Sequence, residues 1–395
     1  MSSDVFEKCF SFHVVEELKQ TGFYPYFHRV GSEQGPEITV DDTKKIVVCS
    51  NNYLGLANHP KVVESSVIAT KKYGTSCTGS RFLNGTNDLH EKVEQKFAKF
   101  VGKEDAILFT TGHHSNLGAI SCLVGKGEVV VTDRLDHASI IDGCRLSFGE
   151  MVRFRHNDMA DLERQLSRYQ GKAMLIVVDG IFSMEGDIAN LPEISKLTKK
   201  YSARLFVDEA HSLGVLGKKG TGIGEYFNMH DDIDIVMATA SKSLASIGGF
   251  IASSSKVVDY IKHNARSMIF TASLPPACVG AIDTALDLIV AEPERRTRLM
   301  QTAKKMKEEF KTMGYSVNNS QSPIIPLTVG NDLVAFKMWK MLFDEGVFAS
   351  PVVTPAVPEG QSIIRTSYMA THTDNHLNFI LEKFRKVGKT LGIIA

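Results

Sequence analysis

Short runs of apolar, often β-branched residues alternate along this chain with longer stretches that have helical periodicity. Several of the runs are apolar at nearly every position, which is typical of strands covered on both faces of a parallel sheet. The alternation therefore predicts an α/β fold built on a mostly parallel sheet. The predicted strands are Lys45–Cys49, Ala106–Thr110, Glu128–Thr132, Met174–Asp179, Arg204–Asp208, Asp234–Ala238 and Gly249–Ser253.

The pattern changes near residue 290. A charged amphipathic helix is predicted at Glu294–Met313. Short strands at Ile324–Val329 and Ser362–Ser367 follow it, with helices between and after them. We expect an N-terminal arm at 1–50, a large domain at 51–290 and a smaller α+β domain at 291–395.

Composition and charge exclude several classes of protein. The 45 Lys and Arg residues balance 45 Asp and Glu residues, so the chain has no net field to attract nucleic acid. Its apolar runs are far shorter than the roughly 20 residues that span a bilayer, and its first residues lack the apolar core of a signal peptide. The six cysteines show no paired spacing, which favours a reducing compartment. We expect a cytoplasmic protein without a transmembrane segment or a nucleic-acid partner; contact with a membrane surface stays open.

Polar side chains gather where the predicted strands end. In open α/β sheets, ligands bind beyond the carboxyl ends of the strands, so several polar strand ends at one edge favour a binding site there. Acids, histidines, hydroxyls and one lysine occupy five such ends: Thr110–Asn116, Asp133–His137, Asp179–Ser183, Asp208–His211 and Thr239–Lys242.

Lys242 is the most informative of these residues, because it follows an apolar strand and lies among hydroxyl groups. A solvated loop lysine would fit the same position. A lysine in a packed, partly dry turn would instead have a lowered pKa and could form a Schiff base. The neighbouring hydroxyls and the start of a helix at Gly112–Asn116 suit a phosphate, and Asp208 could hold a proton on a pyridine nitrogen. Together these residues predict pyridoxal 5'-phosphate as the cofactor.

Seven stretches, in order along the chain, resemble the α-oxoamine synthases. They are Ser50–Leu56 (SNNYLGL), Gly79–Thr86 (GSRFLNGT), Asp136–Ser139 (DHAS), Asp179–Asp187 (DGIFSMEGD), Val207–Gly214 (VDEAHSLG), Ser241–Phe250 (SKSLASIGGF) and Phe270–Pro275 (FTASLP). Members of that family join an amino acid to an acyl-CoA and release carbon dioxide. The resemblance implies the fold-type I transferase architecture: a large domain with a mostly parallel seven-stranded sheet, and a smaller α+β C-terminal domain.

The resemblance also implies a role for each matching residue. Lys242 would form the Schiff base and then act as acid and base at Cα, Asp208 would pair with the pyridinium nitrogen, and His137 would stack on the pyridine face. The other implied cofactor contacts are His211 and Ser183 near the phenolic oxygen, Thr239, Ser241 and the backbone of Gly112 and His113 at the phosphate, and Thr271 from a second subunit. Asn51 and Arg365 would bind the amino-acid carboxylate, a task that a planar guanidinium suits.

Within the family, Ser241–Phe250, Lys262–Arg266 and Met369–Thr373 most resemble bacterial members that act on L-serine and a long-chain acyl-CoA. The implied activity is a decarboxylative condensation that gives 3-ketodihydrosphingosine, CoA and carbon dioxide, the first step of sphingolipid synthesis. The implied assembly is a homodimer with shared active sites. Phe82 stands where members with a short dicarboxylic acyl donor carry a polar residue, which argues against such a donor.

Two departures and several alternatives stay open. His113 follows Gly112 where an aromatic residue is common in the family, and Ala240 precedes Ser241 where Phe or Leu is common. The same chemistry could act on glycine with acetyl-CoA, on alanine with a pimeloyl donor, or in the synthesis of an acyl-derived signal molecule. Two alternatives of other classes are a catalytically silent subunit and a metal enzyme that uses His113, His114, His137 and His211.

Overall fold

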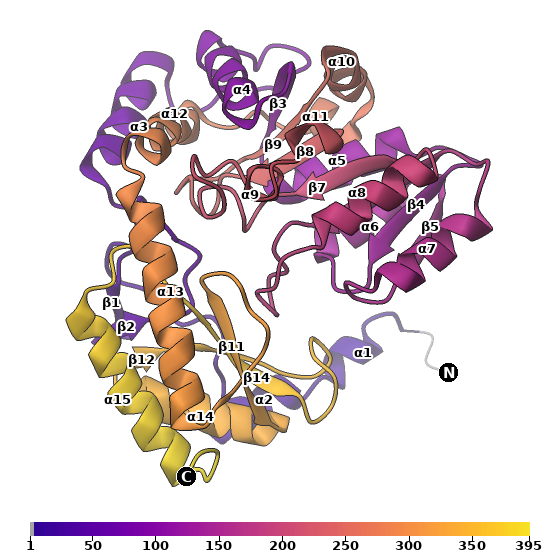
Figure 1. The fold of residues 1–395 in the computed structure, drawn as a ribbon. Helices are drawn as coiled ribbons and strands as arrows, with labels where there is room; N and C mark the ends of the chain where they lie inside the picture. The colour runs from indigo at the N-terminus through magenta and orange to yellow at the C-terminus, as the bar shows by residue number, and fades with distance from the viewer. Residues whose placement is uncertain (1–3) are drawn as a thin grey trace.

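The computed structural model describes residues 4–395, and its centre is a seven-stranded sheet (Figure 1). The strand order is β3 (Asp105–Phe109), β9 (Gly249–Ser253), β8 (Ile235–Thr239), β7 (Arg204–Asp208), β6 (Met174–Asp179), β4 (Val129–Asp133) and β5 (Glu150–Phe154). Only β9 is antiparallel to its neighbours; the remaining pairs are parallel. The predicted α/β fold with a mostly parallel sheet is therefore confirmed.

Alternate residues of the strands enter two separate hydrophobic clusters. Val129, Ile176 and Leu205 belong to one cluster, and Val130 and Val177 belong to the other. Because successive side chains of a strand point to opposite faces, the two clusters are the two covered faces of the sheet. Burial on both faces explains why the sequence of these strands is apolar at nearly every position.

Helices cover both faces. The helices α5 (Gly112–Leu123), α6 (Ala138–Leu146), α10 (Ser255–Asn264) and α11 (Arg266–Ile269) pack on one face, and α4 (Asp88–Val101), α7 (Met159–Arg168), α8 (Leu191–Lys200) and α12 (Pro276–Ala291) pack on the other. The remaining helices of this part are α3 (Pro60–Tyr73), which packs on α12, and the short α9 (Ile223–Tyr226).

Two strands differ from the sequence prediction. The run predicted at Lys45–Cys49 forms β2 (Thr43–Val47), but it lies outside the main sheet, between β1 (Glu37–Val40) and β12 (Val347–Phe348). The seventh strand of the main sheet is β5, which was not predicted. Only Val152 and Phe154 of β5 are buried, because β5 is an edge strand with a partly exposed face, and its sequence lacks the apolar run of a central strand.

The C-terminal part has its own sheet and its own core. The antiparallel sheet has the order β10 (Ser316–Val317), β11 (Ile324–Gly330), β14 (Ser362–Ser367) and β13 (Ser350–Val352). The helices α13 (Glu294–Met313), α14 (Asp332–Asp344) and α15 (Asp374–Thr390) pack with it around Phe310, Trp339 and Phe384. Figure 1 shows α13 running from α12 to this second core. The division at 51–290 and 291–395 stays a prediction.

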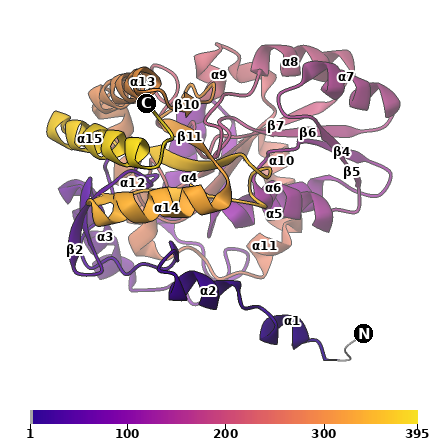
Figure 2. The same ribbon diagram turned by 90° about the horizontal axis from the view of Figure 1, so that it is seen from below.

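The N-terminal helices α1 (Glu7–Phe10) and α2 (Val14–Gln20) contain no buried residue. They project from the body of the molecule in Figure 2 and carry exposed apolar side chains at Phe6, Phe10 and Val14. None of the helices in residues 4–395 is long and apolar enough to cross a bilayer.

Candidate active site

A cavity of about 330 Å³ lies at the carboxyl edge of the main sheet, beyond the ends of β6, β7 and β8. Eight of the residues singled out in the sequence line it: Gly112, His113, His137, Asp208, His211, Thr239, Ser241 and Lys242. They meet because neighbouring parallel strands end at the same edge, and the segments that follow them turn over that edge.

One wall of the cavity is the first turn of α5. The side chain of Thr111 caps this helix by accepting from the amide of His114 at 3.1 Å, and the described hydrogen bonds leave the amides of Gly112 and His113 free. A Cβ at Gly112 would lie 2.7 Å from Thr239 Oγ1, so only glycine lets the helix start against that hydroxyl. Free amides at a helix N-terminus beside hydroxyl groups form a site for a phosphate-like anion.

Lys242 follows β8 on the turn Ala240–Ser246. Burial lowers the pKa of its ammonium to about 8, although the carboxylates of Asp208 and Asp179 oppose this shift. Arg365 contributes further to the lowering through its positive charge. An amine with this pKa is a nucleophile and a proton carrier near neutral pH.

A hydrogen-bonded chain joins Asp208 to His137. Asp208 Oδ2 accepts from Asn116 Nδ2 at 2.7 Å, and the same amide group donates to Ser139 Oγ at 2.9 Å. Ser139 Oγ lies 2.7 Å from His137 Nδ1, which also accepts from the Ser139 amide at 3.2 Å. Because Nδ1 acts as an acceptor, the hydrogen of the neutral ring is on Nε2. Burial lowers the pKa of His137 and favours that neutral ring.

Two further carboxyl groups lie beside Asp208. Asp179 is its neighbour across the β6–β7 pair, and Asp136 lies behind Asp179 and accepts from the Asp179 amide at 2.8 Å. Burial and the adjacent carboxylates raise the pKa of both Asp179 and Asp136 well above the usual range. Asp208 accepts from two N–H groups, those of Asn116 and Ala210. Its charge contributes to the raised pKa of Asp179.

A second chain of contacts leads from His211 to the C-terminal part. The hydroxyl of Tyr53 lies 2.7 Å from His211 Nδ1 and 3.3 Å from Asn51 Oδ1. Asn51 Oδ1 accepts from Arg365 Nη2 at 3.1 Å, and Arg365 Nε donates to the carbonyl of Ser183 at 2.7 Å. The predicted carboxylate-binding residues Asn51 and Arg365 are therefore in contact, and Tyr53 connects Asn51 to His211 in the cavity lining.

Arg365 is 7% exposed, yet no carboxylate among residues 4–395 forms an ion pair with it. A buried guanidinium is normally paired with an anion, because its charge is costly to remove from water. Its partners, the Ser183 carbonyl, Asn51 Oδ1 and the Tyr53 hydroxyl, are all neutral and do not use all five of its N–H donors. The remaining donors and the uncompensated charge point to an anionic ligand.

Two of the predicted cofactor contacts, like Asn51 and Arg365, do not line the cavity of their own chain. Ser183 reaches the site only through its carbonyl, which holds Arg365. Thr271 is half-buried on the segment that pairs Ala272 with Ser80, outside the cavity lining.

The site also contains residues that the sequence analysis did not select. Asn116, Ser139 and Asp179 line the cavity, and Tyr53 supports it from behind. Asn116 and Asp179 stood inside the polar strand ends, but nothing in their local sequence distinguished them from loop residues.

The four-histidine alternative has no geometric support. Among residues 4–395, no group of three or more His, Cys, Asp or Glu side chains is placed to hold a metal ion. His137 and His211 instead make hydrogen bonds with Ser139 and Tyr53.

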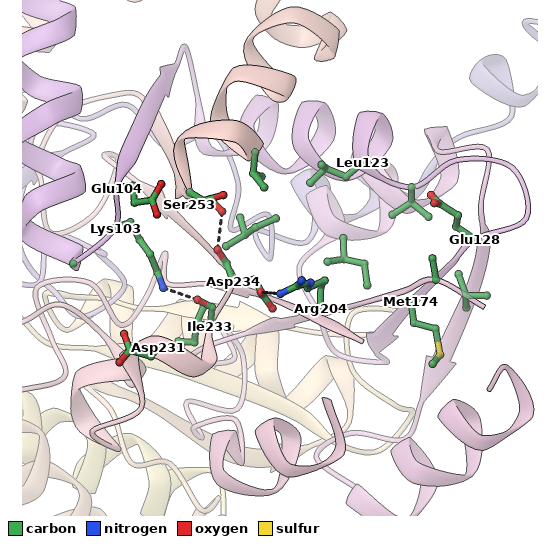
Figure 3. Close-up of a pocket in the computed structure, with 18 residues that line it drawn as sticks. Lys103, Glu104, Leu123, Glu128, Met174, Arg204, Asp231, Ile233, Asp234 and Ser253 are labelled. Carbon is green, nitrogen blue, oxygen red and sulfur yellow. Dashed lines mark hydrogen bonds and ion pairs between the residues drawn. The ribbon is translucent and has the colours of Figure 1, made fainter. Parts of the chain in front are cut away.

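A larger cavity, of about 620 Å³, lies at the opposite, amino edge of the sheet (Figure 3). Two of its charged side chains already have partners: Lys103 donates to the carbonyls of His230 and Ile233, and the exposed Arg204 pairs with Asp234 at 2.7 Å. The smaller cavity, with its free amides and its lysine, is the better candidate for chemistry.

Comparisons with known proteins agree with this choice. The family model for aminotransferases of class I and II matches residues 43–384. The serine palmitoyltransferase of Sphingobacterium spiritivorum is 48% identical over 384 residues, which cover 97% of this chain and 96% of that protein. The 8-amino-7-oxononanoate synthase of Thermoanaerobacter pseudethanolicus is 41% identical over 382 residues, covering 96% of this chain and 97% of that protein. A solved structure of SPT with a PLP internal aldimine has a TM-score of 0.95 at 36% identity, covering 99% of this chain and 100% of that one. The resemblance stated from the sequence motifs is confirmed.

Proposed function

The chain belongs to the aminotransferase class I and II family, and from that premise we propose that it condenses L-serine with a long-chain acyl-CoA, with pyridoxal 5'-phosphate (PLP) as cofactor. The products are 3-ketodihydrosphingosine, CoA and carbon dioxide. The observation that carries the proposal is the buried guanidinium of Arg365, which forms no ion pair with a carboxylate of residues 4–395 and lies near a cavity in which Lys242 and Asp208 lie together.

The donor set of the cavity fits PLP. Lys242 offers an amine for the aldehyde, Asp208 a carboxylate for the ring nitrogen, and the free amides of α5 with Thr239 and Ser241 a cradle for the phosphate. Asn116 Oδ1 is buried without a hydrogen-bond partner among the described residues, which is unusual in a site complete without a ligand. His137 would stack on the ring.

When bound, PLP supplies an electron sink for the carbanion formed at the amino-acid Cα. Asp208 holds the proton at the ring nitrogen; it lines the cavity, and its carboxylate is fixed by the N–H groups of Asn116 and Ala210. Lys242, with a pKa of about 8, takes the proton from Cα and returns it. His137 keeps its hydrogen on Nε2 and can orient the carboxylate.

Arg365 and Asn51 hold the serine carboxylate. Arg365 is fixed by its bonds to Ser183 and Asn51, so its free N–H donors are oriented before the substrate arrives. A fixed carboxylate sets which bond at Cα stands perpendicular to the ring, and misplacement by about 1 Å costs about a hundredfold in rate.

The choice of acyl donor rests on the apolar loop that follows Ser80. Phe82 is 49% exposed and Leu83 is 78% exposed, while the one charged residue between them and Ser80, Arg81, is buried in an ion pair with Glu94, so the exposed surface that this loop offers an acyl chain is apolar. The relatives named 8-amino-7-oxononanoate synthase make that activity the second candidate.

We also propose that the protein works as a homodimer with shared active sites. Phe148 and Phe270 are exposed apolar side chains that a second copy would cover, as are Phe10 of α1 and Val14 of α2. Thr271, which lies outside the cavity of its own chain, would then complete the phosphate site of the neighbour. Sedimentation at assay concentration tests this, and an active monomer would refute it.

We propose a cytoplasmic location, because all six cysteines are free thiols in the structure, as expected in a reducing compartment.

A substrate screen tests the function. Purified, PLP-loaded protein is titrated with serine, alanine and glycine while the visible absorbance of the cofactor is recorded, and CoA release is then measured with acyl donors from acetyl-CoA to palmitoyl-CoA. We expect release with serine and long-chain donors. Turnover with alanine and pimeloyl-CoA would move the assignment to the second candidate, and no cofactor absorbance would reject both.

A further inference from the structure

Tyr53 is fully buried in the segment before α3, and it has no role in the chemistry derived so far. Its hydroxyl lies 2.7 Å from His211 Nδ1 and 3.3 Å from Asn51 Oδ1, and it also accepts a hydrogen bond from Arg365. A tyrosine hydroxyl has one hydrogen to donate, so His211 and Asn51 compete for it.

The other side of each contact restricts the choice. Asn51 Oδ1 already accepts from Arg365 Nη2, which fixes that atom as the amide oxygen. Hydroxyl hydrogen bonds to oxygen span roughly 2.5–3.0 Å, so the 3.3 Å contact to Asn51 is long and the 2.7 Å contact to His211 is the strong one.

The ring of His211 is neutral, because burial and the nearby charges of Lys242 and Arg365 lower its pKa well below the usual range. A neutral imidazole carries one hydrogen, so a hydrogen bond accepted at Nδ1 leaves that hydrogen on Nε2. His211 lines the cavity, and no described residue hydrogen-bonds to Nε2. The adjacent His137 is held in the same form by Ser139.

We propose that Tyr53 is a positioning residue: it donates its hydroxyl hydrogen to His211 Nδ1 and so keeps the hydrogen of His211 on Nε2, available to the phenolic oxygen of PLP. This inference rests on the proposed cofactor. The phenolic oxygen of PLP is an acceptor when it is ionised. His211 with its hydrogen on Nε2 can donate to that oxygen, whereas His211 with its hydrogen on Nδ1 would present a lone pair at Nε2 and could not donate.

The test measures the tautomer directly. The full-length protein is labelled with ¹⁵N-histidine, and the imidazole nitrogens are recorded as purified and again after the cofactor has been removed; His211 is assigned by the signal lost in His211→Ala. Wild type should show hydrogen on Nε2 in both samples. Tyr53→Phe should lower the ratio of Nε2–H to Nδ1–H by roughly three- to tenfold, the effect of losing one hydrogen bond.

Tyr315→Phe is the matched control. Tyr315 is also a buried tyrosine, and its hydroxyl donates to the Phe384 carbonyl at 2.7 Å, in the C-terminal core. Its loss should destabilise the fold by a similar amount and leave the His211 tautomer unchanged. A second readout is the pH dependence of the cofactor absorbance, which Tyr53→Phe should shift and Tyr315→Phe should not; in a His211→Ala background, Tyr53→Phe should add nothing.

Hydrogen on Nδ1 in wild type overturns the proposal, even if Tyr53→Phe does not fold. Equal tautomer ratios in Tyr53→Phe and Tyr315→Phe also overturn it. The tautomer of His211 can be measured without the cofactor. A protein that binds no PLP would therefore reject the proposed function, while the measurement would still show whether Tyr53 donates to His211 Nδ1.

Discussion

Replacing Arg365 by alanine is the most direct test of how the amino acid is held. The guanidinium is 7% exposed and keeps two neutral acceptors, the Ser183 carbonyl at 2.7 Å and Asn51 Oδ1 at 3.1 Å. Arg365 contacts Asn51, and its positive charge acts on Lys242. The variant removes that charge. Serine should still reach the cavity, but its carboxylate would lose its charged partner.

The magnitude follows from leaving one member of a charge pair alone. Removing one partner of a partly dry, hydrogen-bonded ion pair costs roughly 2–4 kcal/mol. Serine should therefore bind about thirty- to a thousandfold more weakly. Arg365→Lys should recover only part of this, because an ammonium cannot keep the two protein acceptors and also make a two-pronged contact with a carboxylate.

Serine affinity is read from the spectral change of the bound cofactor, titrated in wild type and in both variants. Arg296→Ala is the matched control, because Arg296 is a 5% exposed arginine that donates to the carbonyls of Ile289 and Lys218, away from the cavity. It should lower stability and leave serine affinity intact. An unchanged serine dissociation constant in Arg365→Ala would show that the carboxylate is bound elsewhere, with Asn51 and His137 the next residues to test.

Three further variants probe charge in the large domain. Lys242→Met should abolish turnover and cofactor absorbance but raise the melting temperature of the cofactor-free protein at pH 7. The pKa of Lys242 is about 8 in the folded protein against an ordinary value of 10.5, so the gain in melting temperature should shrink between these two pH values and be absent above pH 10.5. A gain that does not change with pH would contradict this. Asp208→Asn should bind PLP yet lose most of its turnover, since an amide cannot hold the pyridinium proton; near-normal rates in the loaded variant would remove Asp208 from the mechanism. His156→Gln should destabilise the fold most below pH 6.5 and lose this effect through about pH 10, because bonds to Asp133 and Asp187 outweigh burial and raise the pKa of His156 to about 10; denaturant unfolding across pH measures it, and a pH-independent difference would disprove it.

The fold could be predicted where a segment is buried on both sides, because burial requires apolar residues at nearly every position. Central strands such as β6 and β7 are covered on both faces, so their apolar runs predicted the strands to the residue. The edge strand β5 is partly exposed and contains charged residues, so it has no apolar run from which a strand could be predicted. The run at Lys45–Cys49 has strand composition, but which sheet it joins depends on β12, about 300 residues away, and no local pattern carries that information.

The site shows the same limit. Parallel strands end at one edge of the sheet, so the sequence could predict that the residues that follow them lie close together. Asn116 could have been selected by one further step, because it lies one turn after Gly112 on the same helix and so shares its face. The contact of Tyr53 with His211 spans 158 positions and depends on how the segment before α3 packs against the turn that follows β7, which only the folded chain determines.

The carboxyl edge gathers three carboxyl groups, Asp136, Asp179 and Asp208, around one lysine, and three full charges there would repel one another. The raised pKa of Asp179 and Asp136 relieves that repulsion by favouring their protonated forms, and the charge of Asp208 is one cause of the raised pKa of Asp179. One negative charge is thereby concentrated at the end of β7, where the ring nitrogen of the proposed cofactor needs it. Lys242 feels that charge as a partial compensation for its burial, which is why its pKa falls only to about 8 and the amine can still carry a proton near neutral pH. Asp179 also opposes the fall in the pKa of Lys242, so the basicity of the lysine depends on Asp179 as well as on Asp208.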